Sequence, residues 1–390
     1  MIEFSTLIKF NPWWTTAKVP DPFLGKFERP LLSQIKKYLG KRQMILVYGL
    51  RRVGKTTLFY QLIQHLLDQK VNPLNIFYFS FDERVGSGEE IIQIYEEKVL
   101  KKTLSQTDKV YLFFDEIQKA ENWQEKIKII YDLNPNTKIF LSGSASVSLQ
   151  KKSQESLAGR MFDFFLKPLS FKEFLAWKDF KVDPKKFELY QSQLRPMLSD
   201  YLRKGGFPEI VNEEEDEVIR NYLKNTVLER IIYKDLPQEF GLKDTELLRI
   251  LLEMVVREPG MIINFDRLSR DLGRSKITII NYFEYLKYSL LIKEIKNFKP
   301  GFLVSSRKGK KAYPANPAFC FALRDDFFQE EVFPKVAELA VITATEGKNY
   351  FRNSYEVDLI LKTESQILPI EIKYGKVEKD SIKKFIEDFG

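Results

Sequence analysis

The chain has 390 residues, enough for two to four domains with hydrophobic cores. Its formal net charge of +8 fits an acidic partner such as nucleic acid and a lysine-rich solvated surface equally well. One cysteine, Cys320, and one histidine, His65, exclude a disulfide framework and a Cys- or His-based zinc site, and they predict a cytoplasmic protein. No apolar run approaches the roughly 18 residues of a membrane helix, so we expect no membrane partner.

Residues 1–21 are predicted to form an N-terminal arm. They contain Asn11-Pro12-Trp13-Trp14, and adjacent tryptophans are not expected to remain in water. A structural arm that packs on the following domain is the favoured interpretation, and a partner-binding site is the alternative.

Residues 22–167 alternate between apolar runs and helical patterns. The runs predict strands at 44–48, 75–80, 110–114 and 138–142, and the patterns between them predict helices near 57–69, 89–102 and 121–133. This alternation predicts a parallel sheet covered on both faces, with ligand at the carboxyl ends of its strands.

Residues 49–56 read G-x-x-x-x-G-K-T, the phosphate-binding loop or Walker A pattern, between a predicted strand and a predicted helix. Gly49 and Gly54 would allow a tight turn, Lys55 would reach the β- and γ-phosphates, and Thr56 would offer its hydroxyl to Mg²⁺. ATP and Mg²⁺ are therefore the expected cofactors, with a chance match as the alternative. The residues of this stretch expected to bind nucleotide are Gly49, Arg52, Val53, Gly54, Lys55, Thr56 and Thr57.

The third predicted strand ends in Asp115-Glu116, the Walker B arrangement. Asp115 would hold Mg²⁺, and Glu116 would polarise the water that attacks the γ-phosphate. An acidic strand end that caps the next helix is the alternative. Arg160 is a candidate for an arginine that reaches the phosphates, in cis or from a neighbouring subunit, and a surface ion pair is its alternative.

Residues 168–235 are predicted to form a helical lid, broken at Gly205-Gly206, and residues 236–312 a winged helix-turn-helix. Helices at 265–272 and 275–286 flank Gly273, and strands at 290–295 and 302–304 would form the wing on either side of basic residues. The residues expected to contact DNA are Lys276, Thr278, Lys299, Arg307, Lys308, Lys310 and Lys311, the last four in the loop beyond the wing. A packing or oligomerisation module is the alternative.

Residues 313–390 contain a D-x₁₂-E-x-K spacing made by Asp358, Glu371 and Lys373, as in PD-(D/E)xK nucleases. The two carboxylates, with Glu338 from a preceding helix, would bind Mg²⁺, and Lys373 would stabilise charge at a phosphate. A strand pair with surface charges is the alternative. The chain ends seventeen residues after Lys373, so we expect an incomplete domain, which argues against nuclease activity.

Together these motifs resemble the AAA_14–DUF4143 type of ATPases, AAA+ relatives close to the STAND ATPases. The resemblance implies an α/β fold: a P-loop AAA+ parallel sheet with a helical lid, then a winged helix-turn-helix, then an α+β restriction-endonuclease-like domain. It also implies that a polar residue after the fourth strand, such as Ser144, senses the γ-phosphate, and that the chain can assemble into a ring or other homo-oligomer.

Three functional hypotheses follow. The first is an ATPase that couples ATP hydrolysis to a conformational change on duplex or branched DNA. The second is a STAND-like switch that acts on a protein partner, and the third is a metal-dependent nuclease regulated by the ATPase.

Overall fold

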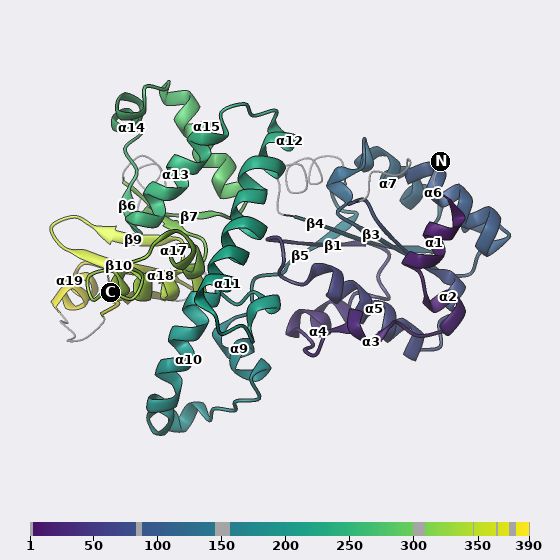
Figure 1. Ribbon diagram of the computed structural model, residues 1–390, viewed down its shortest axis with the longest axis horizontal. Helices are drawn as coiled ribbons and strands as arrows, with labels where there is room; N and C mark the ends of the chain where they lie inside the picture. The colour runs from purple at the N-terminus through teal and green to yellow at the C-terminus, as the bar shows by residue number, and fades with distance from the viewer. Residues whose placement is uncertain are drawn as a thin grey trace. The chain divides into compact units, whose positions relative to one another are not determined.

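The computed structural model describes residues 3–82, 88–144, 157–298, 309–345, 347–363, 366–373 and 380–389. The chain divides into two compact units (Figure 1). The first unit comprises Met1–Leu169 and Leu175–Phe180, and the second comprises Ser170–Phe174 and Lys181–Gly390. No helix among the residues so described combines the length and the apolar character that crossing a membrane requires.

The first unit is built on a parallel sheet in the order β2-β3-β4-β1-β5. Its strands are β1 (Met44–Gly49), β2 (Ile76–Ser80), β3 (Val110–Asp115), β4 (Thr137–Ser144) and β5 (Met161–Phe165). The first four confirm the strands predicted from the apolar runs, whereas β5 was not predicted. Since β4 lies between β1 and β3, the ends of these three strands meet at one edge of the sheet.

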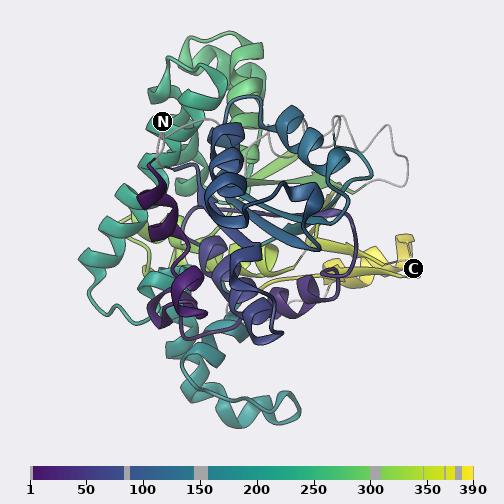
Figure 2. The same cartoon turned by 90° about the vertical axis from the view of Figure 1, so that its right-hand side faces the viewer.

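Helices cover both faces of this sheet (Figures 1 and 2). On β3, Val110, Leu112 and Phe114 share a core with residues of α1, α6 and α7, whereas Phe113 faces Phe59 of α5 with ring centroids 5.3 Å apart. The helices are α1 (Phe4–Phe10), α2 (Trp13–Thr16), α3 (Asp21–Leu24), α4 (Pro30–Lys36), α5 (Lys55–Asp68), α6 (Gly88–Tyr95) and α7 (Trp123–Leu133), with short helical turns at Pro73–Asn75, Glu96–Leu100, Leu104–Gln106 and Ile117–Lys119; α9 (Phe171–Trp177) crosses the division between the units.

The N-terminal arm lies along the edge strand β2. The side-chain amide of Asn11 accepts from the backbone N–H of Tyr78 at 2.6 Å and donates to the Tyr78 carbonyl oxygen at 2.9 Å. The indoles of Trp13 and Trp14 both donate to the carbonyl oxygen of Ile76, at 3.0 and 2.9 Å. These bonds satisfy backbone groups that an edge strand leaves unpaired, as expected of a structural arm.

The helices from α10 onward belong to the second unit. They are α10 (Gln191–Lys204), α11 (Asp216–Asn221), α12 (Leu236–Phe240), α13 (Thr245–Arg257), α14 (Phe265–Leu272), α15 (Lys276–Tyr288), α17 (Pro317–Leu323), α18 (Phe333–Ala344) and α19 (Asp380–Phe389), with further helical turns at Pro184–Tyr190, Pro208–Ile210, Tyr222–Leu228 and Ile231–Asp235. The turn between α14 and α15 has Gly273 in the left-handed region at φ 60°. Ser275 caps α15, because its side chain accepts from the N–H of Thr278.

The sheet of the second unit runs in the order β11-β10-β9-β7-β8-β6. Its strands are β6 (Met261–Ile262), β7 (Ile292–Asn297), β8 (Lys310–Pro314), β9 (Asn349–Arg352), β10 (Glu356–Lys362) and β11 (Ile367–Ile370). The domain boundary predicted between residues 312 and 313 falls inside β8, and β7 pairs with β9 in parallel. That boundary is therefore wrong for this sheet, which joins the two predicted domains. The strand predicted at 302–304 lies outside the described residues.

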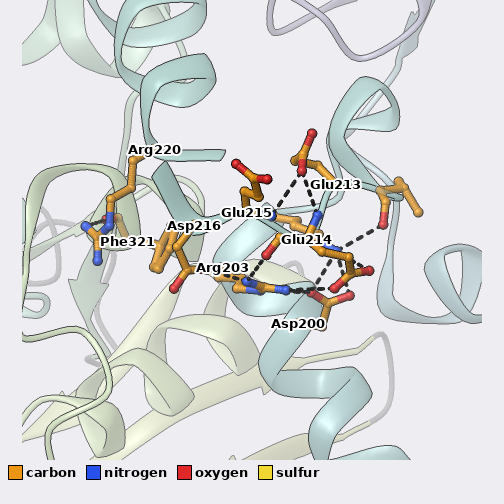
Figure 3. Close-up of polar contacts among 10 residues, drawn as sticks. Asp200, Arg203, Glu213, Glu214, Glu215, Asp216, Arg220 and Phe321 are labelled. Atoms are coloured by element: carbon orange, nitrogen blue, oxygen red, sulfur yellow. Dashed lines mark hydrogen bonds and ion pairs between the residues drawn. The ribbon is translucent and has the colours of Figure 1, made fainter. Parts of the chain in front are cut away.

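An ion-pair network around the buried Lys204 holds the end of α10 against the start of α11 (Figure 3). Arg203 pairs with Asp200 at 2.7 Å and also with Asp216. The neighbouring Lys204 is fully buried, pairs with Asp200 at 2.8 Å and donates to the carbonyl oxygen of Val211 at 3.2 Å. The buried ammonium group of Lys204 thus has both an opposite charge and a backbone acceptor, as stable burial of a charge requires.

Helix α17 and its preceding turn are held by α10 and α11. Asn316 donates to the carbonyl oxygen of Gly205 at 2.8 Å. Gly205 has φ +63°, and a Cβ there would lie 2.2 Å from the Asn316 side chain, so only glycine fits. Arg220 lies 4.0 Å over the ring of Phe321 and donates to the carbonyl oxygen of Arg324 at 2.7 Å (Figure 3).

Candidate active site

The phosphate-binding loop connects β1 to α5. Arg52 and Gly54 both have left-handed backbones, with φ 65° and 95°. Val53 is buried, with 1% of the residue exposed. Gly49 has no positive φ; a Cβ there would lie 2.2 Å from the carbonyl oxygen of Leu166. The expectation that Gly49 serves the turn is therefore corrected, because its lack of a side chain allows β5 to approach.

Helix α5 begins at Lys55, so Thr56 and Thr57 lie in its first turn. Lys55 is 5% exposed, and its ammonium group donates to the carbonyl oxygens of Gly49 at 3.2 Å and Leu50 at 2.9 Å. The N–H groups of a helical first turn have no partners within the helix and carry a partial positive charge. The loop thus presents an ammonium group and a helix N-terminus to an anion.

Asp115 ends β3 and is 2% exposed. Its Oδ2 accepts from the hydroxyls of Thr56 at 2.6 Å and Tyr78 at 3.0 Å. Its Oδ1 accepts from the hydroxyl of Ser142 and from the N–H of Glu116. Burial, followed by the charge of Glu116, raises the pKa of the Asp115 carboxyl, while the Ser142 and Thr56 hydroxyls oppose that rise.

The Thr56–Asp115 pair fits Mg²⁺. The metal prefers hard oxygen ligands, takes only one or two carboxylates, and completes its shell with waters and substrate phosphates. A hydroxyl and a carboxylate oxygen only 2.6 Å apart, beside the phosphate-binding loop, supply that set.

Glu116 follows β3 in a left-handed conformation, with φ 51° and ψ 42°. Such a backbone costs a non-glycine residue about 1–2 kcal/mol. Its Oε2 accepts from the Gln118 amide at 2.6 Å and from the Ser144 hydroxyl at 3.2 Å. Burial raises the pKa of Glu116, but the positive charges of Lys55 and Arg51 lower it, together with the hydrogen bonds from Gln118 and Ser144, and the net shift is downward. An ionised carboxylate is the form that a general base requires.

Four residues around these carboxylates were not singled out from the sequence: Arg51, Tyr78, Gln118 and Ser142. Ser142 and Ser144 are two positions apart on β4 and so lie on the same face of the strand. The serine-rich end of that strand was therefore a partial sequence signal for both hydroxyls. Tyr78 reaches Asp115 only because β2 pairs with β3, with Ser80 opposite Asp115. No local pattern in the sequence reveals that register.

Arg160 lies at the amino ends of the strands, whereas the phosphate-binding loop lies at their carboxyl ends. Its carbonyl oxygen accepts from the N–H of Met44, where β1 begins, and its side chain pairs with Asp132 at 3.1 Å. Strands of this length separate the two ends by about 17–20 Å. Arg160 therefore does not reach phosphates in its own chain, which corrects the cis expectation.

Among the residues predicted to contact DNA, Lys276 and Thr278 lie in the first turn of α15. Lys276 is exposed and pairs with Asp266 at 2.9 Å. The Thr278 hydroxyl lies 2.8 Å from that of Ser275. Lys299, Arg307 and Lys308 lie outside the described residues.

Lys310 and Lys311 lie in β8 rather than in the predicted basic loop. Lys310 pairs with Glu294 of β7 at 3.1 Å. Lys311 is buried, pairs with Glu356 and lies 4.8 Å over the ring of Tyr350. The placement of Lys311 on an exposed loop is therefore wrong, because residue 311 is part of strand β8.

Asp358, Glu371 and Lys373 come together beside β10 and β11. Lys373 lies 2.5 Å from Glu371 and 3.8 Å from Asp358, which also accepts from the N–H of Ile372 at 2.8 Å. Strand β11 ends at Ile370, so Glu371 and Lys373 follow the strand instead of lying in it.

Glu338 of α18 accepts from the Tyr313 hydroxyl at 2.6 Å. Burial raises the pKa of Glu338 and likewise that of Asp358. Within the described part of the chain, no three Asp, Glu, His or Cys side chains are arranged to hold a metal ion. The ligand set expected from Glu338, Asp358 and Glu371 is thus not assembled.

Two protein families match parts of the chain. Residues 41–175 match AAA_14, described as an AAA domain, and residues 195–330 match DUF8612, a domain of unknown function. With the five-stranded parallel sheet and its loop, the first match shows that this part of the chain is a P-loop domain of the AAA type. DUF8612 is found where DUF4143 was expected, and neither match confirms a winged helix or a restriction-endonuclease-like domain.

Relatives occur in archaea. The chain is 28% identical over 365 residues to the uncharacterized protein MJ1544 of Methanocaldococcus jannaschii, which covers 90% of this chain and 79% of that protein. It is 31% identical over 303 residues to MJ1637 of the same organism, covering 69% of this chain and 60% of that protein. The Walker-type ATPase paby2304 of Pyrococcus abyssi aligns with a TM-score of 0.50 and 17% identity, over 77% of this chain and 96% of that chain. At that identity the likeness shows the fold alone.

Proposed function

We propose that this protein is a Mg²⁺-dependent ATP hydrolase that couples hydrolysis to a conformational change on DNA. The observation that carries the hydrolase part is the convergence of Thr56, Asp115 and Glu116 beside the phosphate-binding loop. Thr56 and Asp115 supply oxygen ligands for the metal, Glu116 supplies a carboxylate for water activation, and the adjoining loop with Lys55 supplies the phosphate site.

The chain's own residues would act as follows. The backbone N–H groups of the loop and the first turn of α5 bind phosphate oxygens, and Lys55 exchanges its bonds to Gly49 and Leu50 for the β- and γ-phosphates. Thr56 and Asp115 would hold Mg²⁺, which would neutralise charge on the phosphates. Glu116 orients the attacking water and accepts its proton, while Ser144 fixes the Glu116 carboxylate.

The DNA part rests on α15 and the charge of the chain. Ser275 caps this helix after a short glycine turn, and Lys276 is exposed in its first turn. The net charge of +8 adds an attraction to phosphates that does not depend on sequence. Self-assembly belongs to the same proposal, since Arg160 could serve only the site of a neighbouring subunit, after release from Asp132.

The test is the rate of ATP hydrolysis in Mg²⁺, alone and with single-stranded, duplex and four-way DNA. Hydrolysis should be stimulated by at least one DNA form and should be lost in Asp115→Asn. Asp68→Asn, the same change at the exposed far end of α5, is the matched control and should leave the rate unchanged. Hydrolysis that ignores all three DNA forms would refute the DNA part, and no hydrolysis by the unaltered protein would refute the whole.

A further inference from the structure

Tyr78 of β2 directs its hydroxyl at the carboxylate that would hold Mg²⁺. The side chain is 2% exposed, and its hydroxyl donates to Asp115 Oδ2 at 3.0 Å. The same oxygen accepts from the Thr56 hydroxyl at 2.6 Å. Two hydroxyls therefore converge on one carboxylate oxygen, and only one of them belongs to the phosphate-binding loop.

The two hydroxyls have different fates when the metal binds. The oxygen of Thr56 would be a metal ligand, so its hydrogen bond to Asp115 would no longer position the carboxylate. Tyr78 belongs to β2 and has no such competing role, and Ser142 donates to the other oxygen, Oδ1. Tyr78 is then the hydroxyl that fixes the orientation of Oδ2.

The N-terminal arm in turn fixes Tyr78. Asn11 pairs with both backbone groups of Tyr78, at 2.6 and 2.9 Å. Phe10 and Tyr60 lie against the Tyr78 ring, with centroid distances of 6.2 and 5.0 Å. Asn11 is itself completely buried and donates a further bond to the carbonyl oxygen of Leu7 at 2.8 Å. The contacts thus run continuously from the arm to the carboxylate.

We infer that Tyr78 is a positioning residue for the metal ligand Asp115, and that the N-terminal arm sets its position through Asn11. This inference rests on the proposed Mg²⁺-ATP site. It gives the arm a role in metal binding in addition to covering the edge of the sheet. When a residue that hydrogen-bonds to a metal ligand without contacting the metal is replaced, the metal affinity typically falls by about 10–100-fold.

The first experiment compares Tyr78→Phe with Tyr95→Phe. Tyr95 is a matched control, because it is also buried in the first unit and its hydroxyl donates to the backbone of Leu74 at 2.6 Å, away from Asp115. Mn²⁺ binding is measured by electron paramagnetic resonance in the presence of a non-hydrolysable ATP analogue. Binding of that analogue without metal is measured separately in EDTA.

Tyr78→Phe should weaken Mn²⁺ binding by about 10–100-fold and leave binding of the analogue in EDTA unchanged. Tyr95→Phe should change neither. Two results would overturn the inference: equal Mn²⁺ affinities in Tyr78→Phe and Tyr95→Phe, or a Tyr78→Phe variant that loses as much affinity for the analogue in EDTA as for Mn²⁺. In either case Tyr78 would have no effect specific to the metal. If the unaltered protein binds neither the analogue nor Mn²⁺, the proposed function itself fails.

The second experiment tests the arm. Asn11→Ala should also weaken Mn²⁺ binding, whereas Asn75→Ala should not. Asn75 immediately precedes β2 and its side chain donates to the carbonyl oxygen of Lys109, which precedes β3, so this bond lies at the end of the strands away from Asp115. Asn11→Ser is the fallback if Asn11→Ala does not fold, since it keeps a polar side chain at this buried position but is too short to pair with both backbone groups of Tyr78. Unchanged Mn²⁺ affinity in the folded arm variant would overturn the role of the arm.

Discussion

Replacing Gly49 by alanine should destabilise the first unit without any ligand present. An ideal Cβ at Gly49 would lie 2.2 Å from the carbonyl oxygen of Leu166, whereas real Cβ atoms essentially never approach closer than 3.0 Å. The clashing atom belongs to the backbone, so β1 and the end of β5 must separate. That separation strains the bond from the Leu166 N–H to the Tyr48 carbonyl oxygen, which measures 2.8 Å.

The expected cost follows from these contacts. Overpacking costs about 1–3 kcal/mol, and a lost hydrogen bond adds about 1 kcal/mol, so Gly49→Ala should lower the free energy of unfolding by about 2–4 kcal/mol. Gly54→Ala is the matched control: its Cβ would meet nothing within 4 Å, but φ is +95°. A left-handed alanine costs only about 1–2 kcal/mol.

The assay is urea unfolding followed by tryptophan fluorescence. All four tryptophans, at positions 13, 14, 123 and 177, belong to the first unit, so the signal reports on that unit. Gly49→Ala should be the less stable of the two variants. A Gly49→Ala variant as stable as the unaltered protein, or a Gly54→Ala variant less stable than Gly49→Ala, would refute a close backbone contact at Gly49.

Three further predictions concern lysines. Lys55→Ala should abolish ATP binding in an equilibrium titration, and retained affinity would remove Lys55 from the site. Burial, with a smaller effect of Lys109, lowers the pKa of Lys138 from 10.5 to about 8. Between about pH 8 and pH 10.5 the Lys138 side chain is protonated in the unfolded chain and neutral in the folded protein. The free energy of unfolding should therefore rise with pH in this range, by at most about 1.4 kcal/mol per pH unit. Urea unfolding at about pH 8 and about pH 10 should show this rise in the unaltered protein and not in Lys138→Met, and equal pH dependence would contradict it. Lys276→Ala should weaken binding to all DNA sequences and reduce by about one the slope of log affinity against log salt concentration. Lys37→Ala, which removes an exposed lysine of the first unit, should change neither. Equal slopes in the two variants would exclude a phosphate contact at Lys276.

The parts of the site that lie close together in the sequence could be predicted. The spacing of Gly54, Lys55 and Thr56 specifies a loop and a helix start by itself, and an apolar strand ending in Asp115-Glu116 can be recognised from a few residues. The apolar runs likewise predicted four of the five strands of the first sheet, because strands buried on both faces are nearly continuous in hydrophobic residues.

The contacts between distant segments could not be predicted. Tyr78 meets Asp115 only through the register of β2 with β3, and Asn11 reaches Tyr78 across 67 positions of sequence. In the second unit, β7 pairs with β9 across some 50 residues, which joins two predicted domains in one sheet. Lys311 looked like a surface charge because its partner, Glu356, comes from that distant part of the sheet.

Glu116 is the residue proposed to activate the attacking water, and Glu116→Gln isolates that role. The change keeps the size of the side chain but removes the charge, so ATP affinity should be retained while the rate of hydrolysis falls by about 10²–10⁴-fold. Glu121→Gln, an exposed glutamate five positions later, is the matched control and should hydrolyse ATP normally. Hydrolysis by Glu116→Gln at the rate of the unaltered protein would contradict the assignment of this site.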